Sequence, residues 1–217
     1  MVHRYVKSVE VRKPYQKITP STTKQDGSIN PRHSYHMIRA DSNKWIELAC
    51  EEAVQSVKEG GGPFGAVLIQ VDDYTNEAIR YWKDRNQVTE SNDPTAHAEV
   101  SVIRSACHEL GVFTLSDIRR SESKLPQVGE TSHCELYSSC EPCPMCYSAA
   151  MWARIPVLVF SATRYDAAEP GVEFLDEQIH REVTKSYPER SVKVYWFPSE
   201  NALKAFRLWR DSGNTKY

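Results

Sequence analysis

The chain alternates between segments whose apolar residues recur every three or four positions and short, mostly apolar runs rich in branched side chains. The first pattern is typical of amphipathic helices and the second of buried strands. Helices are expected over 45–57, from about 142, and over 100–110 and 199–210. Strands are expected at 65–71, 78–82, 135–138, 157–160 and 192–197. This alternation predicts a layered α/β domain.

Turn-forming residues give the expected ends of several elements. The first helix follows Asp41-Ser42 and ends at 60–62, three consecutive glycines, and the helix over 100–110 is stopped by Gly111. Residues 119–133 are polar and are interpreted as a surface loop inserted before a strand, removable without disturbing the core.

Length and composition are those of a globular protein. The chain has 217 residues, of which 40% are hydrophobic and 26% charged, enough for one domain with additions. No apolar run approaches the roughly 18 residues that a membrane span needs. Three of the six cysteines lie in 140–146, with no secretory segment ahead of them. Metal binding in a reducing, cytoplasmic environment is therefore expected.

The formal net charge of -2 conceals a basic N-terminal extension. Residues 1–40 carry eight Lys/Arg against two acidic residues, whereas the rest carries 19 basic and 27 acidic residues. We expect 1–40 to extend from, or lie along, a domain formed by 41–217. Two alternatives stay open: an organelle-targeting peptide, since Val2, Tyr5, Val6 and Val9 have helical spacing, and a segment that binds phosphate or a partner.

Two short motifs, His97-Ala98-Glu99 and Pro142-Cys143-Pro144-Met145-Cys146, carry the candidate chemistry. One imidazole and two thiolates suit Zn²⁺, one ion per chain, and three protein ligands leave a fourth position for water. In a regular first turn, two residues apart diverge by about 200 degrees. Glu99 is therefore interpreted as a base beside His97 that takes the proton of the zinc-activated water and passes it to the leaving group.

Other metal sites are conceivable from the same cysteines. Cys140 would close a structural site with His97, Cys143 and Cys146, but Glu99 would then have no role. An iron-sulfur centre would need a fourth thiolate from elsewhere. The remaining cysteines lie on apolar faces and are expected to be core residues: Cys50, Cys107 and Cys134.

These motifs resemble those of the cytidine-deaminase superfamily and, within it, of guanine deaminases with that fold. The resemblance covers 41–217, and its most specific stretches are 61–67, 91–100 and 139–146, with further matches at 152–154, 166–169 and 206–210. It implies a three-layer α/β/α domain with a mixed central sheet of about five strands. It also implies zinc on His97, Cys143 and Cys146, with Glu99 as the proton shuttle.

The resemblance further implies a base pocket. Asn86 would bond the edge of the base, Phe64 would line the pocket, and the backbone N–H of Ala98 would add a polar contact. An amide can both donate to and accept from a purine, although Asn86 also reads as a turn residue. Family members carry two adjacent acids after a Gly-Phe pair, whereas here the acids of 171–177 are split, so Glu173 is the first choice and Asp176 the second.

Relatives of this kind are homodimers, often with exchanged C-terminal segments. Here 198–217 would form the helix and lid, and Tyr217 matches a terminal tyrosine that closes the partner's pocket, although a terminal residue alone would be read as frayed. The expected activity is hydrolysis of a free purine base, guanine to xanthine and ammonia. Alternatives are a guanosine or other nucleoside or nucleobase deaminase, a tRNA adenosine deaminase, for which the acidic body is unfavourable, and a non-catalytic zinc protein.

Overall fold

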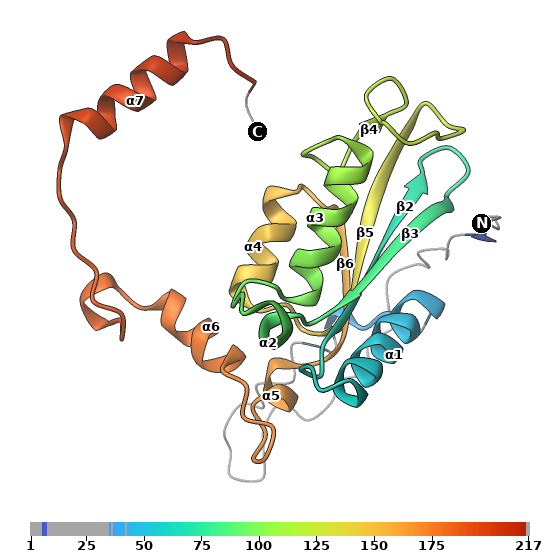
Figure 1. Ribbon diagram of the computed structural model, residues 1–217, viewed down its shortest axis with the longest axis horizontal. Coiled ribbons are helices and arrows are strands. Elements are labelled where there is room, and N and C mark those ends of the chain that lie inside the picture. Colours follow the sequence, from blue (N-terminus) through green and yellow to red (C-terminus); the bar gives the residue numbers. More distant parts are fainter. Residues whose placement is uncertain (1–5, 8–34, 36, 42, 216–217) are drawn as a thin grey trace.

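A mixed sheet forms the centre of the computed structural model, which describes residues 6–7, 35, 37–41 and 43–215 (Figure 1). Its four long strands are β2 (Gly65–Asp72), β3 (Glu77–Arg85), β5 (Thr131–Cys140) and β6 (Val157–Ala162). The two-residue strands β1 (Val6–Lys7) and β4 (Ile118–Arg119) complete the order β1-β3-β2-β5-β4, with β6 beside β5. Only the β5–β6 pair is parallel among these described strands.

Helices cover both faces of the sheet, so β2 is buried along its whole length. Its alternate residues Ala66 and Leu68 pack on the side of α3 (Ala98–Leu110) and α4 (Pro144–Trp152). Val67 and Ile69 pack on the opposite side, against α1 (Lys44–Lys58). Strand side chains alternate between faces, so one apolar strand fills two cores. The predicted three-layer arrangement is confirmed.

Local sequence explains how α1 begins and how it fits on the sheet. Asn43 Oδ1 accepts hydrogen bonds from the backbone N–H groups of Trp45 and Ile46 at 2.9 and 3.2 Å, so the N-terminal cap is Asn43, the residue after the expected Asp41-Ser42 boundary. A Cβ on Gly65 would lie 2.5 Å from the Ala49 carbonyl oxygen. Glycine is therefore required where the strand passes under the helix.

The prediction of a removable polar loop over 119–133 is wrong. Strand β5 begins at Thr131, and the preceding loop enters the core through Gln127, which is 7% exposed. Gln127 accepts a 3.0 Å hydrogen bond from the buried Gln70 amide of β2, and the Gly129 N–H donates to Asp72 Oδ2 at 2.7 Å. A buried amide needs such partners, which a polarity pattern does not reveal.

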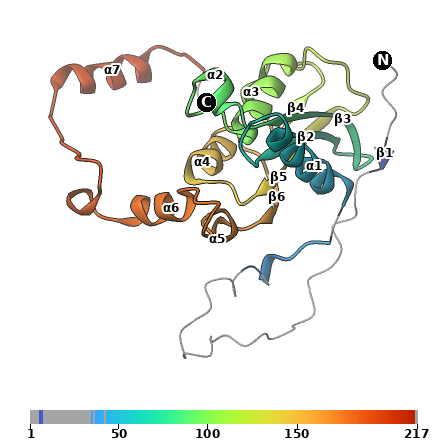
Figure 2. The ribbon, with the colours of Figure 1, turned by 60° about the horizontal axis from the view of Figure 1, so that its bottom comes forward.

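Beyond β6 the chain forms α5 (Arg164–Ala167) and then leaves the body as an arm, defined here as residues 170–215. The arm contains α6 (Asp176–Thr184), the 3-10 helix η2 (Tyr187–Glu189) and α7 (Glu200–Asp211). Figures 1 and 2 show α7 standing clear of the body. The predicted strand at 192–197 is not part of any sheet in the described structure. None of the described helices has the length and apolar character needed to cross a bilayer.

Candidate active site

Two helix starts converge on one point. His97 is the N-terminal cap residue of α3 and Cys143 that of α4, each with an extended backbone (φ/ψ of -70/152° and -61/166°). Pro144 occupies the first turn of α4, where a missing N–H costs no helical hydrogen bond. Cys146, one turn into α4, faces the same point as Cys143.

The three side chains form a compact metal-binding group. His97 Nδ1 lies 3.4 Å from Cys146 Sγ and 3.8 Å from Cys143 Sγ, and all three ligand atoms are within 4.8 Å of one another. Tetrahedral zinc with bonds of about 2.0–2.3 Å would separate its nitrogen and sulfur ligands by about 3.5 Å. The residues therefore fit zinc with little rearrangement.

The remaining cysteines stay outside this group. Cys140 Sγ donates to the Thr163 carbonyl at 3.7 Å, and burial raises the pKa of its thiol to about 12. Among the described residues, the metal-binding group contains only His97, Cys143 and Cys146. This arrangement leaves the fourth coordination position to a non-protein ligand, as a catalytic site requires.

Glu99 lies in the first turn of α3 and is 6% exposed. Its Oε1 accepts a 3.1 Å hydrogen bond from Ser138 Oγ, and its Oε2 is 3.4 Å from Cys146 Sγ. Burial raises the pKa of this carboxyl, which favours proton uptake. The hydrogen bond with Cys146, together with His97, lowers the pKa of Cys143 to about 4 and so favours the thiolate that binds metal.

A cavity of about 420 Å³ opens above this group. Its walls come from the loop before β2, the end of β3, the short helix α2 (Val88–Ser91), the two motif loops and the start of the arm. The lining residues are Gly60, Gly61, Gly62, Phe64, Asn86, Val88, Thr89, Pro94, His97, Glu99, Glu141, Cys143, Phe174 and Asp176. Two of the candidate metal ligands, the buried Glu99 carboxylate and an aromatic wall thus share one cavity.

Two of the residues expected to hold a base are in the wall. The backbone N–H of Asn86 donates to the Phe64 carbonyl at 3.0 Å, and Asn86 Oδ1 accepts from the Val88 N–H at 3.1 Å. Asn86 therefore both faces the cavity and shapes the turn after β3. Phe64 contacts Phe174 edge to face, with ring centroids 4.7 Å apart. Ala98 is fully buried at the start of α3.

The structure separates the two acids considered for base recognition. Asp176 lines the cavity, and burial followed by the charge of Cys143 raises its pKa. Glu173 adopts a left-handed backbone (φ 61°) and is not in the cavity wall. The sequence interpretation missed Phe174 and Glu141, and it overlooked that Asp176 and Glu177 are themselves two adjacent acids after a phenylalanine. Tyr217 lies outside the described residues.

Comparison with known proteins agrees with this site. Residues 39–162 match the family model of the cytidine and deoxycytidylate deaminase zinc-binding region, more than half of the chain. The chain belongs to this family and is a zinc-dependent aminohydrolase.

Individual relatives indicate which deaminases the chain is similar to. The guanine deaminase of Bacillus subtilis (strain 168) is 40% identical over 171 residues, which cover 79% of this chain and 92% of the relative. The X-ray structure of guanine deaminase from Bacillus subtilis is similar with a TM-score of 0.63 and 37% identity, covering 82% of this chain and 99% of that one. A tRNA-specific adenosine deaminase of Aquifex aeolicus (strain VF5) is 32% identical over 150 residues, covering 66% and 83%.

Proposed function

We propose that this chain catalyses the hydrolytic deamination of guanine to xanthine and ammonia. The observation that carries the proposal is the similarity to a guanine deaminase over 92% of that enzyme's length. The cavity supports it, because an amide, a carboxylate and aromatic rings surround the metal-binding group. These groups suit a flat heterocycle with both donors and acceptors on its edge.

Each side chain then has a defined task. His97, Cys143 and Cys146 would hold zinc, which would supply the Lewis acidity that lowers the pKa of a water molecule to about 7. Glu99 would take protons from the water as its oxygen bonds the amino-bearing ring carbon. It would pass one proton to the adjacent ring nitrogen and one to the amino nitrogen, which leaves as ammonia when the C–N bond breaks. Ser138 holds the Glu99 carboxylate by its 3.1 Å hydrogen bond.

Base recognition falls to the walls of the cavity. Asn86 and Asp176 line the cavity. In this proposal Asn86 and the Ala98 N–H bond the polar edge of the base, and Asp176 accepts from its N–H groups. Phe64 and Phe174 supply apolar surface for the ring. We propose Asp176 as the acid that reads the base, in place of Glu173.

The function is tested by incubating purified protein with guanine, guanosine, cytosine and adenosine and measuring ammonia. We expect release from guanine, loss of release after chelation and recovery on adding zinc. Glu99→Gln should retain stoichiometric zinc and lose activity by about 10²- to 10⁴-fold. No ammonia from any purine would refute the proposal, and unchanged turnover of Glu99→Gln would refute the role of Glu99.

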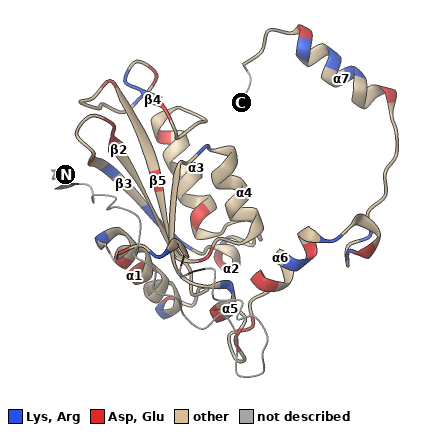
Figure 3. Cartoon of the chain, turned by 180° about the vertical axis from the view of Figure 1, so that it is seen from behind, with Lys and Arg blue, Asp and Glu red and all other residues tan. Residues whose placement is uncertain are grey.

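A tRNA adenosine deaminase is the second candidate, favoured by the relative from Aquifex aeolicus. Binding of a polynucleotide needs basic surface. Basic and acidic side chains are both present on each of α1, α6 and α7 (Figure 3), so none of these helices is purely basic. RNA binding that weakens with salt and disappears when 1–40 are removed would support a tRNA deaminase. A turnover of guanosine above that of guanine would instead support a nucleoside deaminase.

We propose that the chain forms a homodimer with exchanged C-terminal arms. Within the described structure, β6 pairs with β5 alone, so its other edge lacks a strand. The strand-like segment 192–197 has no strand to pair with, and its Tyr195, Trp196 and Phe197 are 86–89% exposed. A cavity of about 710 Å³ borders β6 at Leu158 and Phe160. An edge strand and an unpaired apolar strand are complementary.

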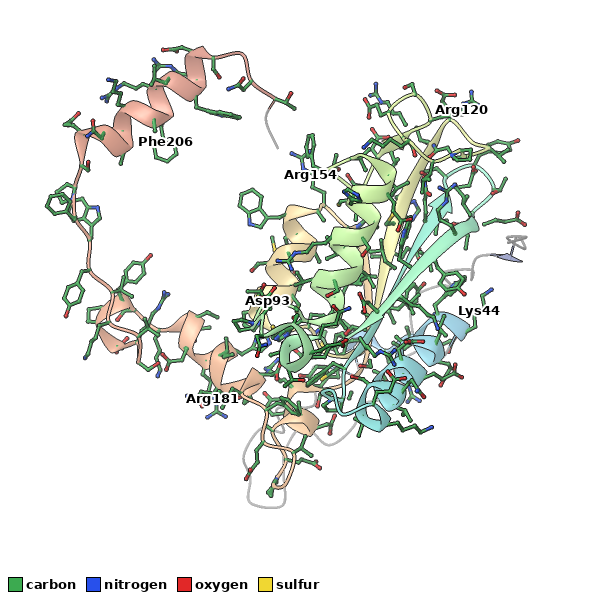
Figure 4. All side chains as sticks on the ribbon, viewed as in Figure 1. Lys44, Asp93, Arg120, Arg154, Arg181 and Phe206 are labelled. Atoms are coloured by element: carbon green, nitrogen blue, oxygen red, sulfur yellow. The ribbon has the colours of Figure 1, made fainter. Side chains whose placement is uncertain are left out.

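The arm's last helix supports the same proposal. Leu203 and Phe206 are 52% and 73% exposed, and Figure 4 shows the side chain of Phe206 away from the body of its own chain. On α4, Tyr147 and Met151 are also exposed. Apolar surfaces of this kind mark protein contacts. In the exchanged dimer, Tyr217 would close the partner's cavity.

Light scattering at several protein concentrations tests the dimer, and a chain ending at residue 191, which lacks both segment 192–197 and α7, tests the exchange. We expect a dimer for the full chain and a monomer with zinc but little activity for the shortened one. A monomeric, fully active full-length chain would contradict the proposal.

We place the enzyme in the cytoplasm, which is supported by cysteines present as free thiols in the described residues. Residues 1–40 are proposed to be a surface extension of the deaminase domain formed by 41–217. Localisation of a fluorescent fusion, with and without 1–40, would detect a targeting role instead.

A further inference from the structure

We propose that Arg164 is a positioning residue that holds Asp176 in the base cavity by joining the start of α6 to the loop that carries the metal-binding cysteines. The proposal rests on the proposed function, because it assigns the support of the acid that reads the base. Arg164 itself does not line the cavity.

The guanidinium of Arg164 bridges two carboxylates from different parts of the chain. Its Nε lies 2.6 Å from Glu177 Oε2, and its Nη1 lies 2.6 Å from Glu141 Oε1. The backbone N–H of Arg164 donates to Glu141 Oε2 at 3.0 Å, and the Tyr35 hydroxyl donates to the same oxygen at 2.6 Å. Only the planar fork of an arginine can hold two carboxylates in fixed directions at once.

This bridge is shielded from water. The side chains of Arg164, Glu141 and Glu177 are 25%, 12% and 15% exposed. Thr163 and Asp166 form a capping box at the start of the helix that carries Arg164. The Thr163 N–H donates to Asp166 Oδ2 at 2.7 Å, and the Asp166 N–H donates to Thr163 Oγ1 at 3.3 Å. Ion pairs with limited access to water are stronger than exposed ones and leave a costly charge when one partner is removed.

The two carboxylates are next to functional residues. Glu141 is two positions before Cys143 and lines the cavity, while Glu177 follows Asp176 in the first turn of α6. Arg164 therefore sets the distance between the reading acid and the metal-binding loop. It also places a positive charge between two negative side chains that would otherwise repel.

The start of the arm contacts the body at α6, which touches α4 and α5, and the Arg164 bridge anchors the first turn of that helix. Gly171 (φ 88°) and Glu173 (φ 61°) both have left-handed backbones, so the connecting segment turns sharply and extends outward. Its other contacts with the body include the Phe174 N–H to the Ala167 carbonyl at 2.9 Å and the Phe174 ring on Phe64. Neither of these contacts fixes the rotation of α6 about its axis.

Arg181 provides a matched control. Its Nε lies 2.6 Å from Glu177 Oε1, so it binds the same carboxylate as Arg164. However, Arg181 belongs to α6 itself, is 73% exposed and points into solvent in Figure 4. Removing Arg181 takes away a charge partner of Glu177 without releasing α6 from the body.

The test compares Arg164→Met with Arg181→Met in the full-length, zinc-loaded protein. A displacement of about 1 Å costs on the order of 10²-fold in turnover, so Arg164→Met should lower kcat/KM for guanine by about 10- to 100-fold, with zinc content unchanged. Arg181→Met should change it less than about twofold. Arg164→Lys should be intermediate, because an ammonium is a point charge without the fork.

A double-mutant cycle separates positioning from general structural damage. In an Asp176→Asn background, Arg164→Met should cost less than about threefold more, since its effect acts through the carboxylate already removed. The equilibrium dissociation constant of guanine, measured in a Glu99→Gln background, should rise for Arg164→Met and not for Arg181→Met. If Arg164→Met does not fold, Glu177→Gln, which breaks the same bridge with an isosteric side chain, should give the same losses.

The outcomes are distinguishable. Additive effects of Arg164→Met and Asp176→Asn, or equal effects of the two arginine variants, would overturn the positioning role while leaving an active guanine deaminase. A wild-type protein that neither binds nor deaminates guanine would overturn the proposed function itself.

Discussion

The amphipathic helices α1 and α7 differ in whether their apolar side is buried. In α1, Trp45, Ile46 and Ala49 form an apolar stripe that the sheet buries. In α7, Leu203 and Phe206 form a similar stripe, yet every residue from Glu200 to Asp211 is exposed. An amphipathic pattern specifies a helix with one apolar side, but it does not specify which chain covers that side.

The body and the arm therefore depend on different contacts. The helix α1 is stabilised by packing within its own chain, whereas most helical stability in α7 must come from packing that the isolated chain does not provide. The arm nevertheless contributes Phe174 and Asp176 to the cavity. In the proposed dimer, assembly and catalysis would therefore be coupled through this one segment.

The largest effect is expected for a charge placed under α1. Ala49 is fully buried, so Ala49→Asp should destabilise the fold by about 4 kcal/mol or more, measured by urea unfolding. Val54 is on the outer side of the same helix and is 56% exposed, so Val54→Asp should cost about 1 kcal/mol or less. Similar losses for both would show that the buried stripe does not stabilise the body.

A charge on α7 should act on assembly and leave the body folded. Burying a phenylalanine is worth about 1.5–3 kcal/mol, so Phe206→Asp should weaken dimerisation by about 10- to 150-fold. Sedimentation over a dilution series measures this change, with Arg207→Ala as the control. An unchanged dimer together with a lowered unfolding free energy would place α7 on its own body.

The two candidate acids at the start of the arm, Asp176 and Glu173, are expected to differ in their effect on activity. Loss of a hydrogen bond to a charged group costs about 1.5–3 kcal/mol, so Asp176→Asn should reduce kcat/KM for guanine by about 10- to 150-fold. Glu173→Gln should stay within about threefold, because Glu173 is not in the cavity wall. The reverse order would restore Glu173 as the reading acid.

The smallest effect concerns a body ion pair remote from the arm. Hydrogen bonds to Glu135 and Asp73 raise the pKa of His133 above its usual value near 6.5. A raised folded-state pKa stabilises the protein below about pH 6.5, and this contribution is lost as pH rises through the folded pKa.

His133→Asn should therefore lower the unfolding free energy by up to about 1 kcal/mol near pH 6 and by less at pH 8 or above. Urea unfolding at both pH values measures this, in the full chain and in a chain ending at residue 191. A pH response that depends on the arm would contradict the independence of the body.

The catalytic group was predictable because its members lie in two short segments. His97 and Glu99 are separated by one residue, and Cys143 and Cys146 by two, so local helix geometry already orients each pair. The base-reading acid was not predictable in the same way. Glu173 and Asp176 are three positions apart in a turning segment, in which Glu173 has a left-handed backbone and Asp176 lines the cavity.

The loop over 119–133 shows the same limit in the body. Its polar composition predicted a dispensable surface segment, yet Gln127 accepts a hydrogen bond from the buried amide nitrogen of Gln70, 57 positions away in the chain. A hydrogen-bond partner in another strand leaves no periodic signal, so polarity alone assigned the loop to the surface.

The helices, most strands, the layered α/β architecture and the candidate zinc-binding and proton-carrying residues could be predicted from the sequence, because periodicity and short-range spacing act through neighbouring residues. The tertiary structure alone decided that Asp176 and Phe174 line the cavity, that Arg164 bridges Glu141 and Glu177, and that segment 192–197 finds no strand in its own chain. These contacts join residues far apart in sequence, whose meeting depends on how the whole chain packs.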